Sequence, residues 1–294
     1  MDKNIIHNNV DLKSFNSWKV GGRAEKFLIC DDKAILSSLI KTKKIKLPIT
    51  FVGLGSNLLV RDGGVKGTVI VMHGGLKKIN HDEDGLIYTE AGVSCSKLAK
   101  FSAGKDLGKS AFFSGIPGTV GGALAMNAGC YGSETWDYVQ KVLMINLDGD
   151  QIERSKLDFK IGYREIKNFN KDEFFLAAWF KFPKGDKEEA GKKIRELLAH
   201  RKNTQPLNWP TAGSTFRNPK ENFAAKLIED CDLKGYRIGG AQVSDKHANF
   251  IINLGDASAE DIENIIIYIQ QVVFKKKSIQ LKREIKIIGE NIDI

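Results

Sequence analysis

Short apolar runs separated by glycine turns dominate the first hundred residues. The runs at 49–52, 57–61, 68–72 and 85–89 are four or five residues long and rich in Val, Ile and Leu, which is typical of strands. A helix is expected from about Ser94 to Gly104. Strands with few long helices between them predict an α+β fold rather than a doubly wound parallel sheet.

The pattern becomes helical after about Lys184. Asp186 with Glu189 three residues later resembles a capping box, and the apolar residues 194, 197 and 198 share one helical face. A second helix is expected over 221–230. The sequence therefore predicts a helix-rich second region.

The last forty residues combine a long helix with an alternating segment. Ser258 can cap a helix with one apolar stripe, formed by Ile262, Ile265, Ile266, Ile269, Val272 and Val273. From 279 to 287 apolar and polar residues alternate, apart from Arg283, which predicts a strand. Glu284 falls at a polar position of this strand, so the pattern alone reads it as solvated.

Composition narrows the class of protein. The chain has 294 residues, of which 42% are hydrophobic and 28% charged, as in ordinary globular proteins. No apolar run approaches the ~18 residues of a membrane helix, and the start lacks a signal-peptide pattern. We expect a cytoplasmic protein with no membrane partner. The cysteines, at 30, 95, 130 and 231, form no metal-ligand spacing or disulfide framework, so no metal is expected, and Cys30 and Cys231 are expected in the core.

The net charge of +9 comes mainly from lysine, since only nine of the 45 basic residues are Arg. The lysine runs carry no interleaved aromatic residues for base stacking. A lysine-rich surface is therefore the simplest interpretation, and no nucleic-acid partner is expected. A small phosphate-bearing ligand remains compatible with this charge.

Two glycine clusters are the main candidate chemistry. One holds Gly53 and Gly55, and the other holds Gly115, Gly118, Gly121 and Gly122. Glycine permits close approach of the backbone to a diphosphate. Leu58 occupies the third glycine position of a Rossmann fingerprint, and no Walker lysine follows. The clusters indicate either a nucleotide site of another design or glycine-rich turns in a tightly packed β domain.

Longer motifs are more specific. They span nearly the whole chain, from 16 to 289. The stretches are Asn16 to Ala24, Gly53 to Val60, Ser114 to Ala123, Asn127 to Gly129, Gly162 to Arg164, Ala212 to Pro219, Lys246 to Asn253 and Glu284 to Gly289. Together they resemble the UDP-N-acetylenolpyruvoylglucosamine reductase family.

The resemblance implies a fold and its cofactors. It implies a two-part FAD-binding domain of the vanillyl-alcohol-oxidase-like (PCMH) type and a C-terminal α+β substrate-binding domain. The expected division is 1–75 and 76–185 for the two FAD subdomains, with 285–294 returning to the first, and 186–284 for the UDP-sugar domain. FAD is expected to bind without a covalent link, NADPH to supply hydride, and the enzyme to be a monomer that makes UDP-N-acetylmuramate for peptidoglycan.

The resemblance also implies the site residues. Arg164 and Glu284 would stabilise negative charge on the substrate, Ser214 would donate a proton, and Tyr163 and Asn218 would bind substrate. From the residues alone, the simpler interpretation of Arg164 is a surface cation and that of Ser214 is a turn or helix-cap residue. The expected FAD contacts are Gly53, Gly55, Ser56, Asn57, Leu58, Ser114, Gly115, Ile116, Pro117, Gly118, Thr119, Gly121, Gly122 and Ala123.

Two departures accompany the resemblance. Ser17 stands where the family more often has Thr, and serine keeps the hydroxyl group. The interval from Arg164 to Ser214 is short, as in the family branch that lacks a tyrosine-bearing closing segment. The alternative functions are another flavin oxidase of the same superfamily and a non-catalytic nucleotide-binding module.

Overall fold

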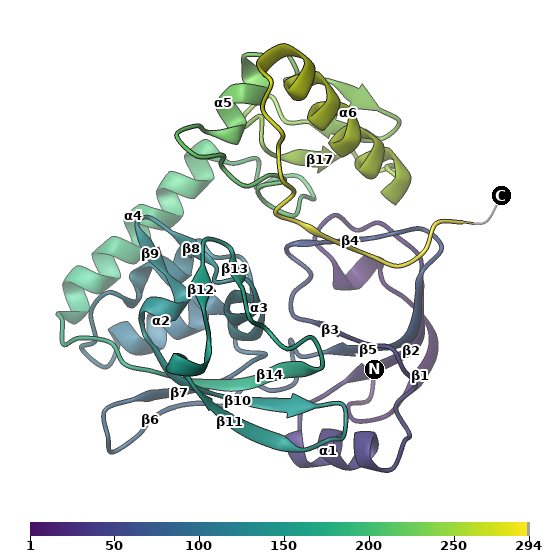
Figure 1. The fold of residues 1–294 in the computed structure, drawn as a ribbon. Helices are drawn as coiled ribbons and strands as arrows, with labels where there is room; N and C mark the ends of the chain where they lie inside the picture. Colours follow the sequence, from purple (N-terminus) through teal and green to yellow (C-terminus); the bar gives the residue numbers. More distant parts are fainter. Residues whose placement is uncertain (293–294) are drawn as a thin grey trace. The chain divides into compact units, whose positions relative to one another are not determined.

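The computed structural model describes residues 1–292 (Figure 1). The chain forms two compact units. Unit 1 comprises Met1–Asn8, Lys26–Leu54 and Gly67–His200, and unit 2 comprises Asn9–Glu25, Gly55–Lys66 and the chain from Arg201 onward. The three-part functional division expected from the sequence remains a prediction, and residues 293–294 of its last segment lie outside the described residues.

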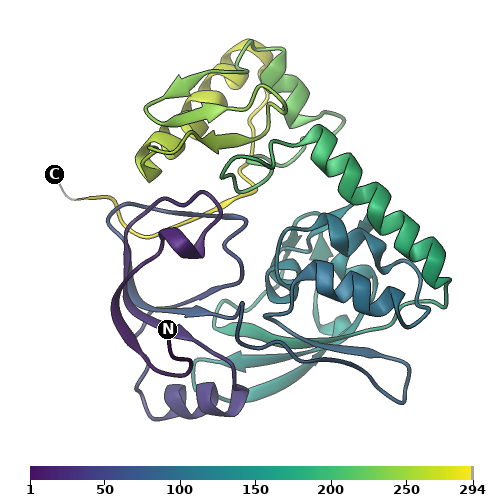
Figure 2. The same ribbon diagram turned by 180° about the vertical axis from the view of Figure 1, so that it is seen from behind.

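An antiparallel five-stranded sheet forms the centre of unit 1. Its strand order is β11-β10-β14-β7-β6. The strands are β6 (Ile79–His81), β7 (Ile87–Glu90), β10 (Val139–Asn146), β11 (Gln151–Ser155) and β14 (Glu173–Phe180). The helices α2 (Cys95–Ala103) and α3 (Val120–Ala125) lie on one side of this sheet in both views (Figures 1 and 2). The longer α4 (Lys187–Thr204) also belongs to unit 1 except for its last turn.

Both faces of this sheet are covered. Phe175 and Phe180 of β14 pack into the core beneath the helices, whereas Leu176 belongs to a second core cluster with Ile145 and Leu36. Successive side chains of a strand point to opposite faces. A strand that is buried on both faces therefore reads as a continuous apolar run, as residues 174–180 do.

A second sheet has the order β1-β2-β5-β3, and its last two strands are parallel. Its strands are β1 (His7–Asp11), β2 (Arg23–Ile29), β3 (Ile49–Val52) and β5 (Val65–Val71). The helix α1 (Lys33–Lys41) follows β2, and the Asp32 side chain caps it by accepting the N–H groups of Ala34 and Ile35. Unit 1 also holds two short strand pairs, namely β8 (Gly129–Cys130) with β9 (Ser133–Glu134) and β12 (Ile161–Gly162) with β13 (Glu165–Ile166).

Unit 2 is built around α6. This helix contacts a three-stranded sheet (Figure 2). A separate parallel strand pair joins residues 58–60 to residues 286–288 of the same unit. The elements are β4 (Leu58–Val60), α5 (Ala224–Glu229), β15 (Arg237–Ile238), β16 (Ala241–Val243), β17 (Ile251–Asn253), α6 (Ala259–Lys277) and β18 (Lys286–Ile288). Trp18 is fully buried in the core of this unit, and its Nε1 donates to the Ile251 carbonyl over 2.8 Å.

Most expected elements are confirmed. The runs at 49–52, 57–61, 68–72 and 85–89 contain β3, β4, most of β5 and most of β7. The helix α2 begins directly after Ser94 as expected, and α4 and α6 begin after the expected caps Asp186 and Ser258. The helix expected over 221–230 is shorter, because Glu221 has a left-handed φ of +61° and α5 begins only at Ala224.

The strand expected over 279–287 is wrong except at its end. Only 286–288 forms a strand, paired with β4. Before it, separate partners take up the backbone groups: the Gln270 side chain donates to the Leu281 carbonyl, and the Arg217 N–H donates to the Lys282 carbonyl. Continuous pairing with one neighbouring strand therefore does not form, although Leu281 and Ile285 are buried as the alternation predicts.

Candidate functional site

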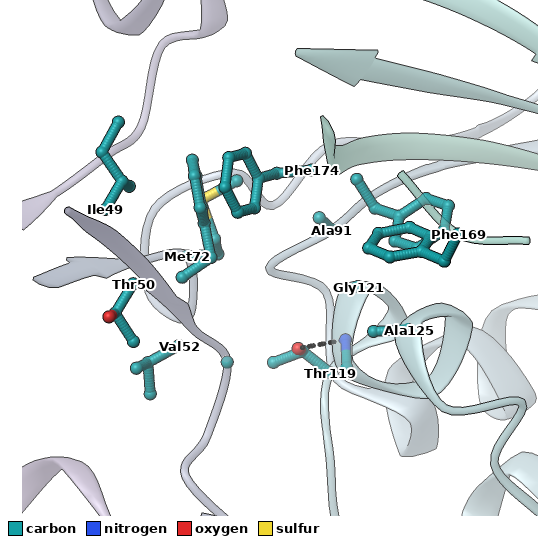
Figure 3. Close-up of a pocket in the computed structure, with 14 residues that line it drawn as sticks. Ile49, Thr50, Val52, Met72, Ala91, Thr119, Gly121, Ala125, Phe169 and Phe174 are labelled. Carbon is teal, nitrogen blue, oxygen red and sulfur yellow. Dashed lines mark hydrogen bonds between the residues drawn. The ribbon is translucent and has the colours of Figure 1, made fainter. Parts of the chain in front are cut away.

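A largely apolar cavity of about 320 Å³ lies within unit 1 (Figure 3). It is bounded by β3, the start of α3 and the segment that leads into β14. Its lining residues are Ile49, Thr50, Phe51, Val52, Gly53, Met72, Ala91, Thr119, Gly121, Gly122, Ala125, Phe169, Phe174 and Phe175. Four of the predicted FAD contacts, Gly53, Thr119, Gly121 and Gly122, are therefore brought together here from the two glycine clusters.

The glycines of this cavity lack a side chain for two different reasons, close packing within the protein and open space toward the cavity. A Cβ at Gly53 would lie 2.4 Å from the Thr119 hydroxyl, and one at Gly121 would lie 2.8 Å from the Ala91 Cβ. Packing within the protein thus excludes side chains at both positions. A Cβ at Gly122 would meet nothing nearer than the Thr119 hydroxyl at 3.7 Å. Gly122 is exposed at the cavity, so its missing side chain leaves room for a ligand.

Most backbone amides of the second cluster already donate hydrogen bonds inside the protein. The N–H groups of Gly118, Val120 and Gly121 donate to carbonyl oxygens over 2.8 to 2.9 Å. The Gly122 N–H instead has a long contact of 3.4 Å to the Thr119 hydroxyl, drawn as the dashed line in Figure 3. The Gly122 amide and the Thr119 hydroxyl are therefore the polar groups best placed to turn to a ligand.

Aromatic side chains form a wall that the sequence analysis missed. Phe51 and Phe174 lie with ring centroids 4.3 Å apart, and Phe169 stacks on Phe175 at 5.4 Å. Figure 3 shows Phe169, Phe174 and Met72 beside the glycine turn. The apolar run at 174–180 is visible in the sequence, but nothing local connects it with 49–53.

The other predicted contacts of the second cluster support the turn. The Ser114 hydroxyl is buried and donates to the Ala111 carbonyl over 2.7 Å, and a Cβ at Gly115 would lie 2.7 Å from the Cys130 sulfur. Ile116 packs against the core of unit 1, Ala123 is buried in it, Gly118 is half-buried and Pro117 is exposed. None of these six residues lines the cavity.

Tyr163 and Arg164 form the turn of the β12–β13 hairpin in unit 1. Arg164 adopts a left-handed φ of +57°, and its guanidinium carbon lies 5.5 Å from the centre of the Tyr163 ring. The buried Asn127 side chain donates to the Gly162 carbonyl over 3.0 Å and to the Glu134 carboxylate over 2.6 Å. Asn127 thus anchors the hairpin directly before the predicted catalytic arginine.

Ser214 and Glu284 lie on neighbouring segments of unit 2. The Glu284 N–H donates to the Thr215 carbonyl over 2.8 Å, and the Asn57 side chain donates to the Glu284 carbonyl over 3.2 Å. Glu284 is half-buried rather than solvated as the strand pattern alone suggested. Glu284 thus meets residues 69 and 227 positions earlier in the sequence through hydrogen bonds of its backbone.

The remaining predicted residues also belong to unit 2. A Cβ at Gly55 would lie 2.1 Å from the Phe15 carbonyl, so packing and its φ of +66° require glycine. Ser56 is half-buried, and Leu58 pairs with Lys286. Asn218 is exposed, and its Oδ1 accepts the N–H of Ala224 over 3.0 Å at the start of α5.

Burial shifts the pKa of at least one ionisable group in each unit. Burial lowers the pKa of His247, whose Nδ1 accepts the Asn249 N–H over 3.3 Å. Burial raises the pKa of Cys30 to about 12, and Cys30 and Cys231 lie in the core as expected. Among residues 1–292, no group of three His, Cys, Asp or Glu side chains could hold a metal ion, and no helix is long and apolar enough to cross a membrane.

Comparisons with known proteins agree with this geometry. The family model described as FAD binding domain matches residues 25–155, and the model described as UDP-N-acetylenolpyruvoylglucosamine reductase, C-terminal domain, matches residues 205–288. The UDP-N-acetylenolpyruvoylglucosamine reductases of Nitrosospira multiformis and Legionella pneumophila are 45% and 46% identical to the chain. These alignments cover 97% and 96% of the chain and 88% and 93% of the relatives.

A solved structure extends the likeness to the fold. The crystal structure of the UDP-N-acetylenolpyruvylglucosamine reductase of Thermus caldophilus matches with a TM-score of 0.82 and 28% identity, over 97% of this chain and all of that one. Fold and cavity define an α+β flavoprotein oxidoreductase with an FAD-binding part and a C-terminal domain. The chain belongs to the UDP-N-acetylenolpyruvoylglucosamine reductase family, which confirms the resemblance, the fold class and the FAD cofactor expected from the sequence.

Proposed function

We propose that Ser214, Glu284 and Arg164 perform the substrate chemistry of this flavoenzyme. The chain catalyses the NADPH-dependent reduction of UDP-N-acetyl-3-O-(1-carboxyvinyl)-glucosamine to UDP-N-acetylmuramate in peptidoglycan synthesis. The observation that supports the residue roles best is the hydrogen bond from the Glu284 N–H to the Thr215 carbonyl. This bond supports the proposal because it joins the segment that follows Ser214 to the segment that carries Glu284.

The cavity of unit 1 fits part of FAD. Its volume of about 320 Å³ is at the low end for organic ligands, so we propose that it takes one ring system of FAD against aromatic side chains such as Phe51 and Phe174. The open space at Gly122 would let the chain approach the diphosphate closely. Asn57 and Leu58 remain proposed FAD contacts on the resemblance alone.

The proposed chemistry balances around the substrate double bond. FAD, when bound, supplies a hydride taken from NADPH to the terminal carbon of the enolpyruvyl group. The electron pair of the double bond then moves onto the neighbouring carbon and its carboxylate. Arg164 stabilises this charge because a guanidinium matches a carboxylate with two donors.

The remaining groups complete the product. Glu284 assists in a protonated or hydrogen-bonded form, since an ionised carboxylate would repel the developing charge. The Ser214 hydroxyl transfers its proton to the carbon, and the serine oxygen regains a proton from water. We propose that Tyr163 supports the Arg164 guanidinium, and that Asn218 binds the sugar nucleotide through its amide donor, because its Oδ1 is engaged at α5.

Replacement of Ser214 by alanine tests the proposal. General acid catalysis contributes about 10²- to 10⁴-fold, so Ser214→Ala should slow single-turnover product formation by at least 100-fold. Reduction of the flavin by NADPH should stay near the wild-type rate, because that transfer does not use the hydroxyl. Wild-type product formation in this variant would assign the proton to water or to another residue.

Two further expectations remain predictions. The monomeric state can be measured by light scattering of the holoenzyme. The cytoplasmic location is expected because the precursor and NADPH are small soluble molecules, and cell fractionation would test it.

A further inference from the structure

Asn249 makes an unusually complete set of contacts with the segment that follows Ser214. Its side chain is 3% exposed. Its Oδ1 accepts the Phe216 N–H over 2.9 Å, and its Nδ2 donates to the Phe216 carbonyl over 2.8 Å. Its own backbone carbonyl accepts the Thr215 N–H over 2.8 Å. One residue therefore satisfies three backbone groups of two successive residues.

The segment around Ser214 has little regular structure of its own. Gly213 has a left-handed φ of +78°, and the Phe216 pairing with Arg283 is an isolated bridge rather than part of a ladder. Asn249 holds this segment on one side, and the Glu284 N–H holds the Thr215 carbonyl on the other. The position of Ser214 thus depends on single contacts, of which Asn249 supplies the largest share.

We propose that Asn249 is a positioning residue that orients Ser214 for proton transfer. This inference rests on the proposed role of Ser214. A misplacement of about 1 Å can cost about 100-fold in rate, and a proton donor must also lie over the correct face of the carbon. Both ends of the amide are needed, because the oxygen accepts from the N–H of Phe216 and the nitrogen donates to the carbonyl of the same residue.

The substitution Asn249→Asp removes one of these contacts without changing size. A carboxylate keeps the acceptor for the Phe216 N–H but places a negative oxygen against the Phe216 carbonyl. Single-turnover product formation should fall by about 10- to 100-fold, while KM and flavin reduction by NADPH stay within a few-fold of wild type. In D2O, the product should lose its single configuration at the new centre, because solvent then delivers the proton to either face.

The pH profile adds a specific signature. A protonated carboxyl group has one donor and one acceptor, as the amide does, and burial raises the pKa of a carboxyl group. Product formation by Asn249→Asp should therefore recover relative to wild type as the pH is lowered. Should the aspartate variant fail to fold, Asn249→Ser, which introduces no charge, should show the same stereochemical loss.

Asn253→Asp is the matched control. Asn253 lies four residues further on and is 4% exposed. Its side chain donates to the Trp18 carbonyl over 2.8 Å and accepts the Gly255 N–H over 2.7 Å, with no hydrogen bond to 213–216. Asn253→Asp should lose about as much thermal stability as Asn249→Asp. It should keep the wild-type rate of product formation and the single configuration of the product.

Two results would overturn the inference. One is a wild-type rate and a single configuration in Asn249→Asp while Ser214→Ala is slow, which would leave the role of Ser214 intact. The other is an equal loss in Asn253→Asp, which would make the effect one of general stability. A wild-type rate in Ser214→Ala would instead overturn the proposed function itself.

Discussion

At the scale of single residues, some glycines are required by packing within the protein and another is expected to be required by ligand binding. Gly53, Gly55 and Gly121 face protein atoms less than 3 Å from where a Cβ would stand. Their identity follows from the fold itself. Gly122 faces no such atom, although it directly follows Gly121 in α3. We therefore expect that a side chain at Gly122 would interfere with FAD binding but not with folding of the empty protein.

Gly122→Val should accordingly give a folded protein that is colourless. The branched side chain would occupy the opening of the cavity without a clash in the empty protein. FAD content is measured by absorbance at constant protein concentration, and folding by circular dichroism and Tm. Gly191→Val, in α4, is the control, since its Cβ would also lie more than 3.4 Å from other atoms and far from the cavity lining. A yellow Gly122→Val protein would contradict the assignment.

Arg164 and Glu284 should act in the second half-reaction only. Both are proposed to stabilise charge on the substrate, and the loss of such a group costs about 100-fold or more. In the Arg164→Ala and Glu284→Gln variants, the enolpyruvyl substrate should therefore reoxidise the reduced flavin slowly. NADPH should still reduce the flavin within a few-fold of the normal rate. Stopped-flow absorbance of each half-reaction measures this.

The reverse pattern would contradict these roles. If flavin reduction collapses and reoxidation is spared, the two residues serve NADPH and not the substrate. Arg195→Ala, on α4, provides a control for the loss of a guanidinium elsewhere in unit 1 and should leave both half-reactions unchanged.

At the scale of elements, the turn before β17 should give the protein a pH-dependent stability. Burial lowers the pKa of His247 below its unfolded value of about 6.5. In the window between the two values, the unfolded chain binds a proton that the folded chain does not. Stability from this group is therefore present above about pH 6.5 and is lost as the pH falls below it.

His247→Gln should remove this contribution. The difference in Tm between pH 7.5 and pH 5.5 should be smaller in the variant than in the wild type. The exposed His81 at the end of β6 offers the control, because its ring is in water in the folded protein as well. An equal change of Tm between the two pH values in wild type and His247→Gln would show that burial of this ring does not contribute to the pH dependence of stability.

At the scale of the whole molecule, FAD should be bound tightly but without a covalent link. Neither glycine cluster contains a Cys or His, and the nearby Cys130 thiol donates to the Phe112 carbonyl over 3.2 Å and does not line the cavity. Acid precipitation should leave the flavin in the supernatant. Added FAD should raise the stability of the empty protein, by about 2.7 kcal/mol at 100 times Kd. A yellow pellet would contradict the non-covalent link.

The sequence by itself determined the local elements and the family. Caps and apolar stripes predicted α4 and α6 because a helix is specified by residues three or four positions apart. The motifs named the candidate residues Arg164, Ser214 and Glu284 only through a resemblance. Their spacing alone did not separate them from surface or turn residues.

Tertiary structure decided how these pieces meet. The cavity joins β3 to Phe169 and Phe174, and Asn249 completes the segment at Phe216, although neither pairing leaves a local signal in the sequence. The strand expected over 279–287 shortened to β18 because distant residues took up the backbone groups before it. Periodicity records which face of an element is apolar, but hydrogen-bond partners far apart in the chain are chosen only when the core packs.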